Sequence, residues 1–122
     1  MRSLIATAIL CCLMLLAATL NFIYVNRVAD EMTALAASLP SPTDSACVEK
    51  AAALCNKWEK NAPLVGLTVG FLTVDKLSEH CETLRSCAVV GDVYGYHAAL
   101  TLLQDSIDDV RRLEKFEIEN LF

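Results

Sequence analysis

The chain begins with a long apolar stretch, LIATAILCCLMLLAATLNFIYV (residues 4–25). Its first 17 residues carry no charge, and Asn21 is its first strongly polar residue. As a helix, 22 residues would span about 33 Å, enough for the roughly 30 Å hydrocarbon core of a bilayer. Tyr24 suits the headgroup level, where an aromatic ring with a polar tip is stable. We therefore expect residues 1–25 to form an anchor that contacts the lipid bilayer through residues 4–25.

The charges on either side of this anchor predict its orientation. Arg2 and the α-amine precede it without any acidic residue, whereas Arg27 is soon followed by Asp30 and Glu31. The positive-inside tendency then places the N-terminus in the cytoplasm. We expect a single-pass protein of the cell membrane whose C-terminal domain is extracytoplasmic. The alternative is a cleaved signal peptide and a secreted helical protein, but the apolar run has no Ala-x-Ala site after it and continues to Val25.

The composition excludes several classes of function. Of the 122 residues, 55% are apolar, and acidic residues outnumber basic ones by 15 to 10. A nucleic-acid-binding protein needs a basic face, and so does a protein that docks electrostatically on anionic lipid. The chain is also too apolar to be disordered. We therefore expect residues 26–122 to form a globular domain that does not bind nucleic acid.

Helical periodicity runs through this domain. An apolar stripe over residues 28–39 predicts that the anchor continues as one rod to about Ser38. Ser41 is a suitable N-cap and Pro42 a suitable first position for a second helix that ends near Lys60. The inward face of this second helix follows one of two patterns: Val48, Ala52, Cys55 and Trp58, or Ala51, Leu54 and Trp58.

Three further segments complete the predicted bundle. Residues 62–74 are uncharged and too few to span a membrane, and we expect a short helix after Pro63. A third helix, capped by Thr73 or Asp75, should bury Val74, Leu77, Cys81, Leu84 and Ala88. Gly91 should end it, and Asp92 should cap a fourth helix with Tyr96, Leu100, Leu103, Ile107 and Val110 inward. The predicted fold is all-α: a transmembrane helix that continues into a small up-and-down bundle.

The residues that carry chemistry are few and scattered. Neighbouring residues in a helix point about 100° apart, so His80 and Cys81 cannot easily share a metal ion. We expect His97 to be a partly exposed helical histidine. The sequence has no Gly-x-Ser-x-Gly elbow and no glycine-rich phosphate loop. We therefore expect no catalytic residues, no metal site and no cofactor.

Several features resemble a known family. They are Trp58-Glu59-Lys60-Asn61, the apolar segment after it, and the ending Phe-Glu-Ile-Glu-Asn-Leu-Phe (116–122). Together with the anchor, they resemble a family of small membrane-anchored helical bacterial proteins catalogued only as a domain of unknown function. The resemblance covers nearly the whole chain and implies no activity. Members often have a histidine and an acid where this chain has Thr73-Val74-Asp75, which argues against a catalytic or metal role there.

Four cysteines follow the anchor: Cys47, Cys55, Cys81 and Cys87. An exported domain would expose them to oxidising conditions. In an antiparallel hairpin the residue numbers of facing partners add to a constant. They add to 136 for Cys55 and Cys81 and to 134 for Cys47 and Cys87, so both disulfides are compatible with a turn near residue 67 or 68. If the second helix continues to residue 72, that constant rises by about ten and neither pair meets; four free thiols are the alternative.

These observations favour a non-enzymatic, membrane-anchored helical module that binds a protein or envelope partner, or a second copy of itself. The expected contacts with the partner or the membrane surface are Trp58, Phe71, Ile118, Leu121 and Phe122. We expect residues 62–74 and 116–122 to lie together near the bilayer or, equally, inside the bundle. The competing hypothesis is a thiol-based redox sensor, which would need an exposed cysteine of low pKa near a cation.

Overall fold

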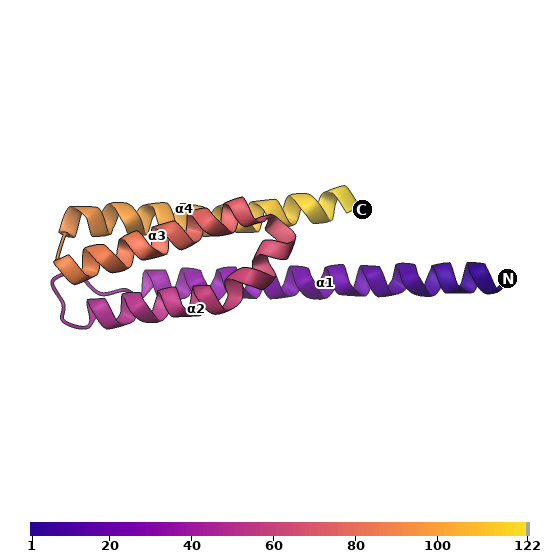
Figure 1. Ribbon diagram of the computed structural model, residues 1–122, viewed down its shortest axis with the longest axis horizontal. Helices are drawn as coiled ribbons and strands as arrows, with labels where there is room; N and C mark the ends of the chain where they lie inside the picture. Colours follow the sequence, from indigo (N-terminus) through magenta and orange to yellow (C-terminus); the bar gives the residue numbers. More distant parts are fainter. Residues whose placement is uncertain (122) are drawn as a thin grey trace.

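The computed structural model consists of four helices joined by short connections (Figure 1). They are α1 (Arg2–Ala37), α2 (Cys47–Val69), α3 (Phe71–Val90) and α4 (Val93–Leu121). The structure describes residues 1–121, without the side chains of Glu114, Phe116, Glu117, Ile118, Asn120 and Leu121. Within this range there is no strand. The expected all-α fold is therefore confirmed.

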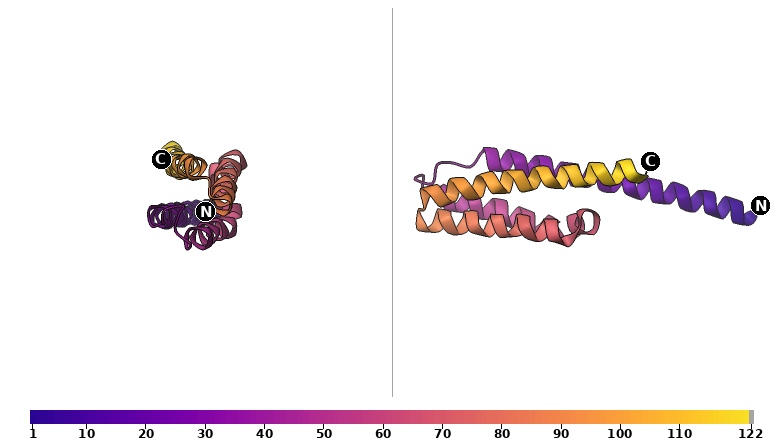
Figure 2. Two further views of the ribbon diagram at one scale, coloured as in Figure 1. Left: turned by 90° about the vertical axis from the view of Figure 1, so that its left-hand side faces the viewer. Right: turned by 90° about the horizontal axis from the view of Figure 1, so that it is seen from above.

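The helices run up and down around one core. Successive helices are antiparallel, α3 packs on both α2 and α4, and α1 packs on α4 and α2 (Figure 2). The core consists of apolar residues from all four helices. All five inward residues expected on α3, from Val74 to Ala88, are buried. On α2 all of the second expected pattern is buried, Ala51, Leu54 and Trp58; of the residues specific to the first pattern only Cys55 is buried, while Val48 is exposed.

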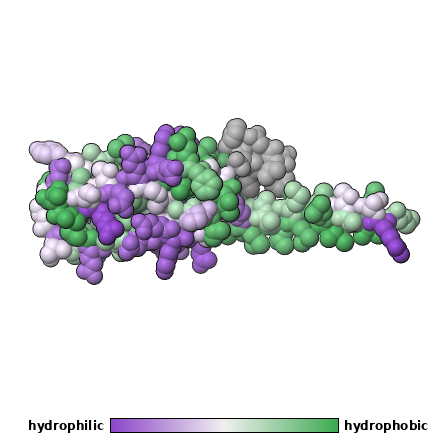
Figure 3. Space-filling view, in the orientation of Figure 1, coloured by the Kyte–Doolittle hydropathy of each residue, from purple (hydrophilic) through white to green (hydrophobic). Residues whose placement is uncertain are grey.

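The first helix has two parts with different surroundings. Residues 1–20 extend beyond the bundle as an apolar rod, visible in green in Figure 3. Helix α1 is long and apolar enough to cross a membrane by length and composition, and its most apolar window is not buried at all. From Asn21 onward the same helix contacts the bundle, and Val25 is fully buried. The packed part thus begins inside the stretch expected to be anchor alone.

The predicted start of the second helix is wrong. Helix α2 begins at Cys47, and residues 39–46 form a loop. Ser41 accepts a hydrogen bond from the backbone N–H of Thr43, and Asp44 accepts one from that of Ala46. These two side chains close local turns, which compete with helix formation. The helix can therefore begin only after them.

The separate short helix expected after Pro63 is also absent, because α2 continues through this proline to Val69. A proline inside a helix leaves the carbonyl four residues earlier without its donor and bends the axis. Figure 1 shows the consequence: the last turns of α2 swing across toward α3. The bend lets a single helix both pack along the bundle and close one of its ends.

Two glycines end helices with backbone conformations that other residues rarely adopt. Gly70 has φ 91° and ψ 150° and separates α2 from α3 by a single residue. Helix α3 therefore begins at Phe71, and the expected caps Thr73 and Asp75 lie inside it. Gly91 has φ 76° and ends α3 as expected. Asp92 caps α4 as expected, because its carboxylate accepts a hydrogen bond of 3.0 Å from the backbone N–H of Gly95.

Candidate functional site

The end of the bundle from which the apolar rod leaves is the first candidate site. The connection between α2 and α3 closes this end, and α4 runs back toward it (Figures 1 and 2). Side-chain contacts fix α2 against α1 here. The Tyr24 hydroxyl donates to Asn61 Oδ1 at 2.6 Å, and the amide of Asn21 contacts the hydroxyl of Thr68. Thr68 therefore lies at the level of Asn21, where α1 begins to contact the rest of the bundle.

Four large apolar side chains are exposed at this connection, which we call the α2–α3 corner: Leu64, Leu67, Phe71 and Leu72. Their exposed fractions are 54%, 75%, 60% and 73%. No charged residue occurs between Asn61 and Val74. The ring of Phe71 lies over Gly66, where an added Cβ would be 2.9 Å from Phe71 Cε1. The expected contact residue Phe71 is thus exposed at the end where the rod leaves.

The last turns of α4 reach the same level along α1. Arg111 forms an ion pair of 2.5 Å with Asp30, which fixes the register of the two antiparallel helices. Each residue further along α4 then lies beside an earlier residue of α1, so the backbone at 121 reaches about the level of residue 20. The expectations for Ile118, Leu121 and Phe122 concern side chains outside the part of the chain that the structure describes.

Trp58 does not belong to this end of the molecule. Only 1% of its surface is exposed, and its indole N–H donates to the hydroxyl of Ser78 at 2.8 Å. It packs in the centre of the bundle because it lies on the inward face of α2, one helical turn from Leu54. The expectation that Trp58 contacts a partner or the headgroups is therefore corrected: it is a core residue.

The opposite end of the bundle has a second exposed apolar surface. Val89, Val90, Val93 and Tyr94 surround the turn between α3 and α4, and we call them the distal tip. Their exposed fractions reach 76% for Val90 and 90% for Tyr94. The sequence predicts only a helix end at Gly91. The two valines that follow Ala88, the last inward residue of α3, are the sequence signal for an exposed apolar surface here.

The cysteines of α2 and α3 meet in one of the two expected combinations. Cys55 and Cys81 are buried, and the Cys55 thiol donates to the backbone oxygen of Cys81 at 3.1 Å. The thiol of Cys55, followed by burial, raises the pKa of Cys81. Trp58 and Ser78 pair with the same residue-number sum, 136, which confirms this register. All six cysteines of the described residues are free thiols, so a disulfide stays a prediction.

Cys47 and Cys87 have different surroundings. Cys47 is buried, and burial together with its thiol raises the pKa of Tyr96 on α4. Cys87 is half-buried beside the start of α4, where its sulfur would lie 2.8 Å from a Cβ added at Gly95. Each thiol thus has α4 as a neighbour. A disulfide between Cys47 and Cys87 stays a prediction.

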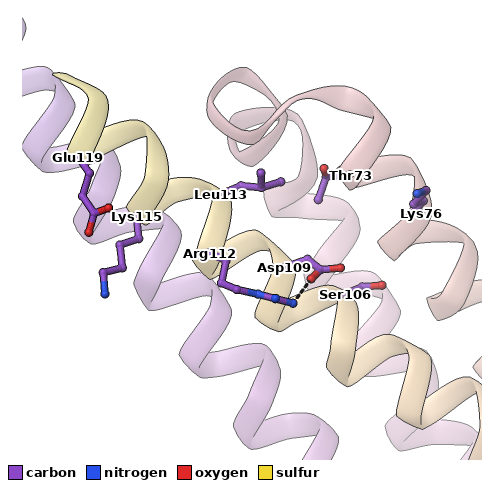
Figure 4. Close-up of a pocket in the computed structure, with 8 residues that line it drawn as sticks. All are labelled: Thr73, Lys76, Ser106, Asp109, Arg112, Leu113, Lys115 and Glu119. Carbon is purple, nitrogen blue, oxygen red and sulfur yellow. Dashed lines mark hydrogen bonds and ion pairs between the residues drawn. The ribbon is translucent and has the colours of Figure 1, made fainter.

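An open groove of about 590 Å³ lies between α3 and the second half of α4 (Figure 4). Thr73, Lys76, Ser106, Asp109, Arg112, Leu113, Lys115 and Glu119 line it. Arg112 pairs with Asp109 on its own helix, and Lys115 and Glu119 point away from Thr73 in this view. The charges are mixed and the groove is wide open, so its lining does not converge on one ligand group.

The described residues contain no group of three His, Cys, Asp or Glu side chains that could hold a metal ion. Comparison with protein-family models, with curated proteins and with solved structures gave no match. The two apolar ends of the bundle and the thiol pair are the features of the described residues that bear on function.

Proposed function

We propose that this chain is a non-enzymatic, membrane-anchored helical module that holds a protein-binding tip above a bilayer. One observation carries the proposal: exposed apolar surfaces occur at opposite ends of the bundle, and the apolar rod leaves from only one of them. Large exposed apolar patches on a folded domain mark contacts with proteins or membranes. The anchored end has the bilayer as its neighbour, so the other end is left for a protein.

The length of the bundle supports this assignment. Residues 21–37 of α1 run beside the other helices, and 17 residues of helix measure about 26 Å. The distal tip therefore lies roughly 25 Å from the level of Asn21, where α1 leaves the bundle. That distance is several times the 5–10 Å depth to which interfacial side chains reach. The valines and the tyrosine of the distal tip cannot contact lipid in this orientation.

The packing of α1 favours an anchor that stays attached over a cleaved signal peptide. Cleavage after the apolar run would remove Asn21, Tyr24 and Val25, which contact Thr68, Asn61 and the core. Removal of this segment would take the fully buried Val25 out of the core. The same packing supports residues 4–20 as the bilayer-spanning part and the remainder of α1 as part of the domain.

The redox-sensor hypothesis has weaker support. A reactive thiol needs exposure and a lowered pKa, because the thiolate is the nucleophile. Cys81 is buried and its pKa is raised. The hydrogen bond with Cys81 lowers the pKa of Cys55, but Cys55 is fully buried and donates its thiol hydrogen to a backbone carbonyl, so it lacks the exposure that a sensor needs. This arrangement suits a structural pair better than a sensor.

Site-specific crosslinking in native membranes tests the proposal. A photo-crosslinking residue at Tyr94 should form an adduct with another protein, and the same residue at Thr101, an exposed polar position of α4, should not. The Val90→Asp substitution at the distal tip should abolish the Tyr94 adduct while the chain stays in the membrane fraction. An adduct that survives Val90→Asp, or equal adducts at both positions, would refute a binding site at the tip. An adduct with a second copy would identify self-association as the contact.

A further inference from the structure

The geometry points to a second membrane contact: we propose that the α2–α3 corner inserts its four apolar side chains into the leaflet from which α1 emerges. This inference rests on the proposed anchor. The occupant of the exposed corner is then the lipid bilayer itself. Continuity with the apolar rod distinguishes this surface from the distal tip, which has no such neighbour.

The uncharged part of α1 outside the bundle is shorter than the hydrocarbon core of a bilayer. The part of α1 that is both uncharged and free of the bundle runs from Leu4 to Leu20, which is 17 residues or about 26 Å. A typical hydrocarbon core is about 30 Å thick. If Leu4 lies at one boundary, the other boundary falls about three residues beyond Leu20, near Ile23. Any tilt of α1 shortens the projected rod and increases the deficit.

The α2–α3 corner lies in the layer of hydrocarbon between Leu20 and the boundary near Ile23. Thr68 contacts Asn21, so the corner lies at the level of Asn21, below the boundary expected near Ile23. Leu67 and Leu72, on either side of this contact in sequence, are exposed by 75% and 73%. Embedding the corner by a few ångströms fills the layer with apolar side chains. Leaving it in water would require the bilayer to thin around α1.

Insertion of the corner would bring polar groups toward the hydrocarbon, and several of them are already hydrogen-bonded. Among the side chains that the structure describes, the amides of Asn21 and Asn61 at this end are paired, with Thr68 and Tyr24 respectively. The backbone of Gly70 donates to Gly66 at 3.1 Å. The first turn of any helix, here that of α3, has N–H groups without intrahelical partners, which need water or headgroups nearby. The corner therefore suits a shallow position at the interface and not the bilayer centre.

The charges around the corner indicate which lipid it needs. Glu59 and Lys60 precede it, Asp75 and Lys76 follow it, and Lys115 and Glu119 lie on the last turns of α4 at the same end, so both signs occur around it. The balance provides no attraction for anionic headgroups. Apolar burial alone then drives insertion, at roughly 25 cal/mol per Å². The interaction should occur in purely zwitterionic membranes and resist added salt.

Depth-dependent quenching in vesicles tests this inference. The full chain with Trp58→Phe would carry one new tryptophan, as Phe71→Trp at the corner, Leu16→Trp in the rod or Tyr94→Trp at the distal tip. The vesicles would be phosphatidylcholine with bromine on the upper part of the acyl chains. We expect strong quenching and a blue-shifted emission for Phe71→Trp, unchanged by high salt. Quenching should be absent for Tyr94→Trp, which aqueous acrylamide should quench instead.

The three positions distinguish the possible failures. If Leu16→Trp is quenched by the brominated lipid and Phe71→Trp is not, the anchor stands and the corner inference falls. If Phe71→Trp is then also shielded from acrylamide, a protein or a second copy covers the corner, which equally refutes insertion. If Leu16→Trp is not quenched, the anchor and with it the proposed function fail. Insertion that requires anionic lipid would refute the purely apolar mechanism.

Discussion

At the scale of single residues, the cysteines show which aspects of side-chain pairing a sequence pattern can predict. Cys55 and Cys81 lie on the two inward stripes and at matching levels, and the structure brings them into contact. Cys47 and Cys87 have a matching residue-number sum, and each has α4 beside it. Residue-number sums give height along a hairpin, whereas the face of a helix depends on the rotation that packing selects.

We expect Cys55 and Cys81 to form a disulfide when the folded protein meets a disulfide oxidant. Closing this 26-residue loop should stabilise the fold by about 3–3.5 kcal/mol in the chain-entropy model. Thiol counting on the denatured, unreduced protein, followed by peptide mapping, would detect the bond. Cys55→Ser is the control, because it should abolish both the crosslink and the gain in unfolding free energy. Four free thiols beyond residue 25 after oxidation would contradict the prediction.

Tyr96 should make the unfolding free energy depend on pH at the alkaline end. Burial and the thiol of Cys47 raise the pKa of Tyr96 above its ordinary value of 10.0. The neutral form is thus favoured in the folded state, so this stability is fully present below pH 10 and is lost as the pH rises through the higher folded value. Denaturant titrations of wild type and Tyr96→Phe should show a steeper decline above pH 10 in the wild type. Parallel curves would contradict this reasoning.

At the scale of the elements, the sequence predicted helix content and inward faces well and boundaries less well. The stripes on α3 and α4 were readable because their period is regular and long. The start of α2 was missed because Asp44 favours a local turn over a helix cap. The continuation through Pro63 was missed because packing at both ends of a helix can outweigh one lost hydrogen bond.

Gly70 is the element boundary most sensitive to substitution. Its φ of 91° with ψ of 150° is a region that essentially only glycine occupies. Gly70→Ala should lower the unfolding free energy by about 1–3 kcal/mol, although a Cβ there would meet no neighbour within 4 Å. Leu72→Ala, an exposed position two residues away, should change it by less than about 0.5 kcal/mol. Equal midpoints for both variants in urea would show that the backbone of this connection rearranges freely.

At the scale of the whole molecule, the natural division of the chain falls at Asn21 and not after Val25. Both the contact of Asn21 with Thr68 and the complete burial of Val25 belong to the bundle. The apolar run hid this division, since the exposed residues 4–20 and the packed residues 21–25 are both largely apolar. Asn21 is the one strongly polar residue within it, followed by Tyr24.

A fragment of residues 21–122 should accordingly be more stable than a fragment of residues 26–122. The shorter fragment loses the buried Val25 and the hydrogen bond of Tyr24 to Asn61. Burying one valine contributes about 1.5–3 kcal/mol and one hydrogen bond about 1 kcal/mol. Both fragments should be largely helical by far-ultraviolet circular dichroism, with the urea midpoint higher for residues 21–122. Identical midpoints would mean that the segment 21–25 packs only when the rod is present.

If α1 spans a bilayer as we propose, the unbroken helix from Arg2 to Ala37 would pass its tilt directly to the bundle. Transmembrane helices lean by about 20° on average, and a stiff rod passes that angle to whatever continues from it. Over the roughly 26 Å of bundle height, such a lean would carry the far end sideways by about 9 Å. A change in bilayer thickness would then change the tilt of α1 and with it the lateral position of the distal tip. Thin and thick vesicles should give different distances between a dye at the far end and acceptors in the lipid.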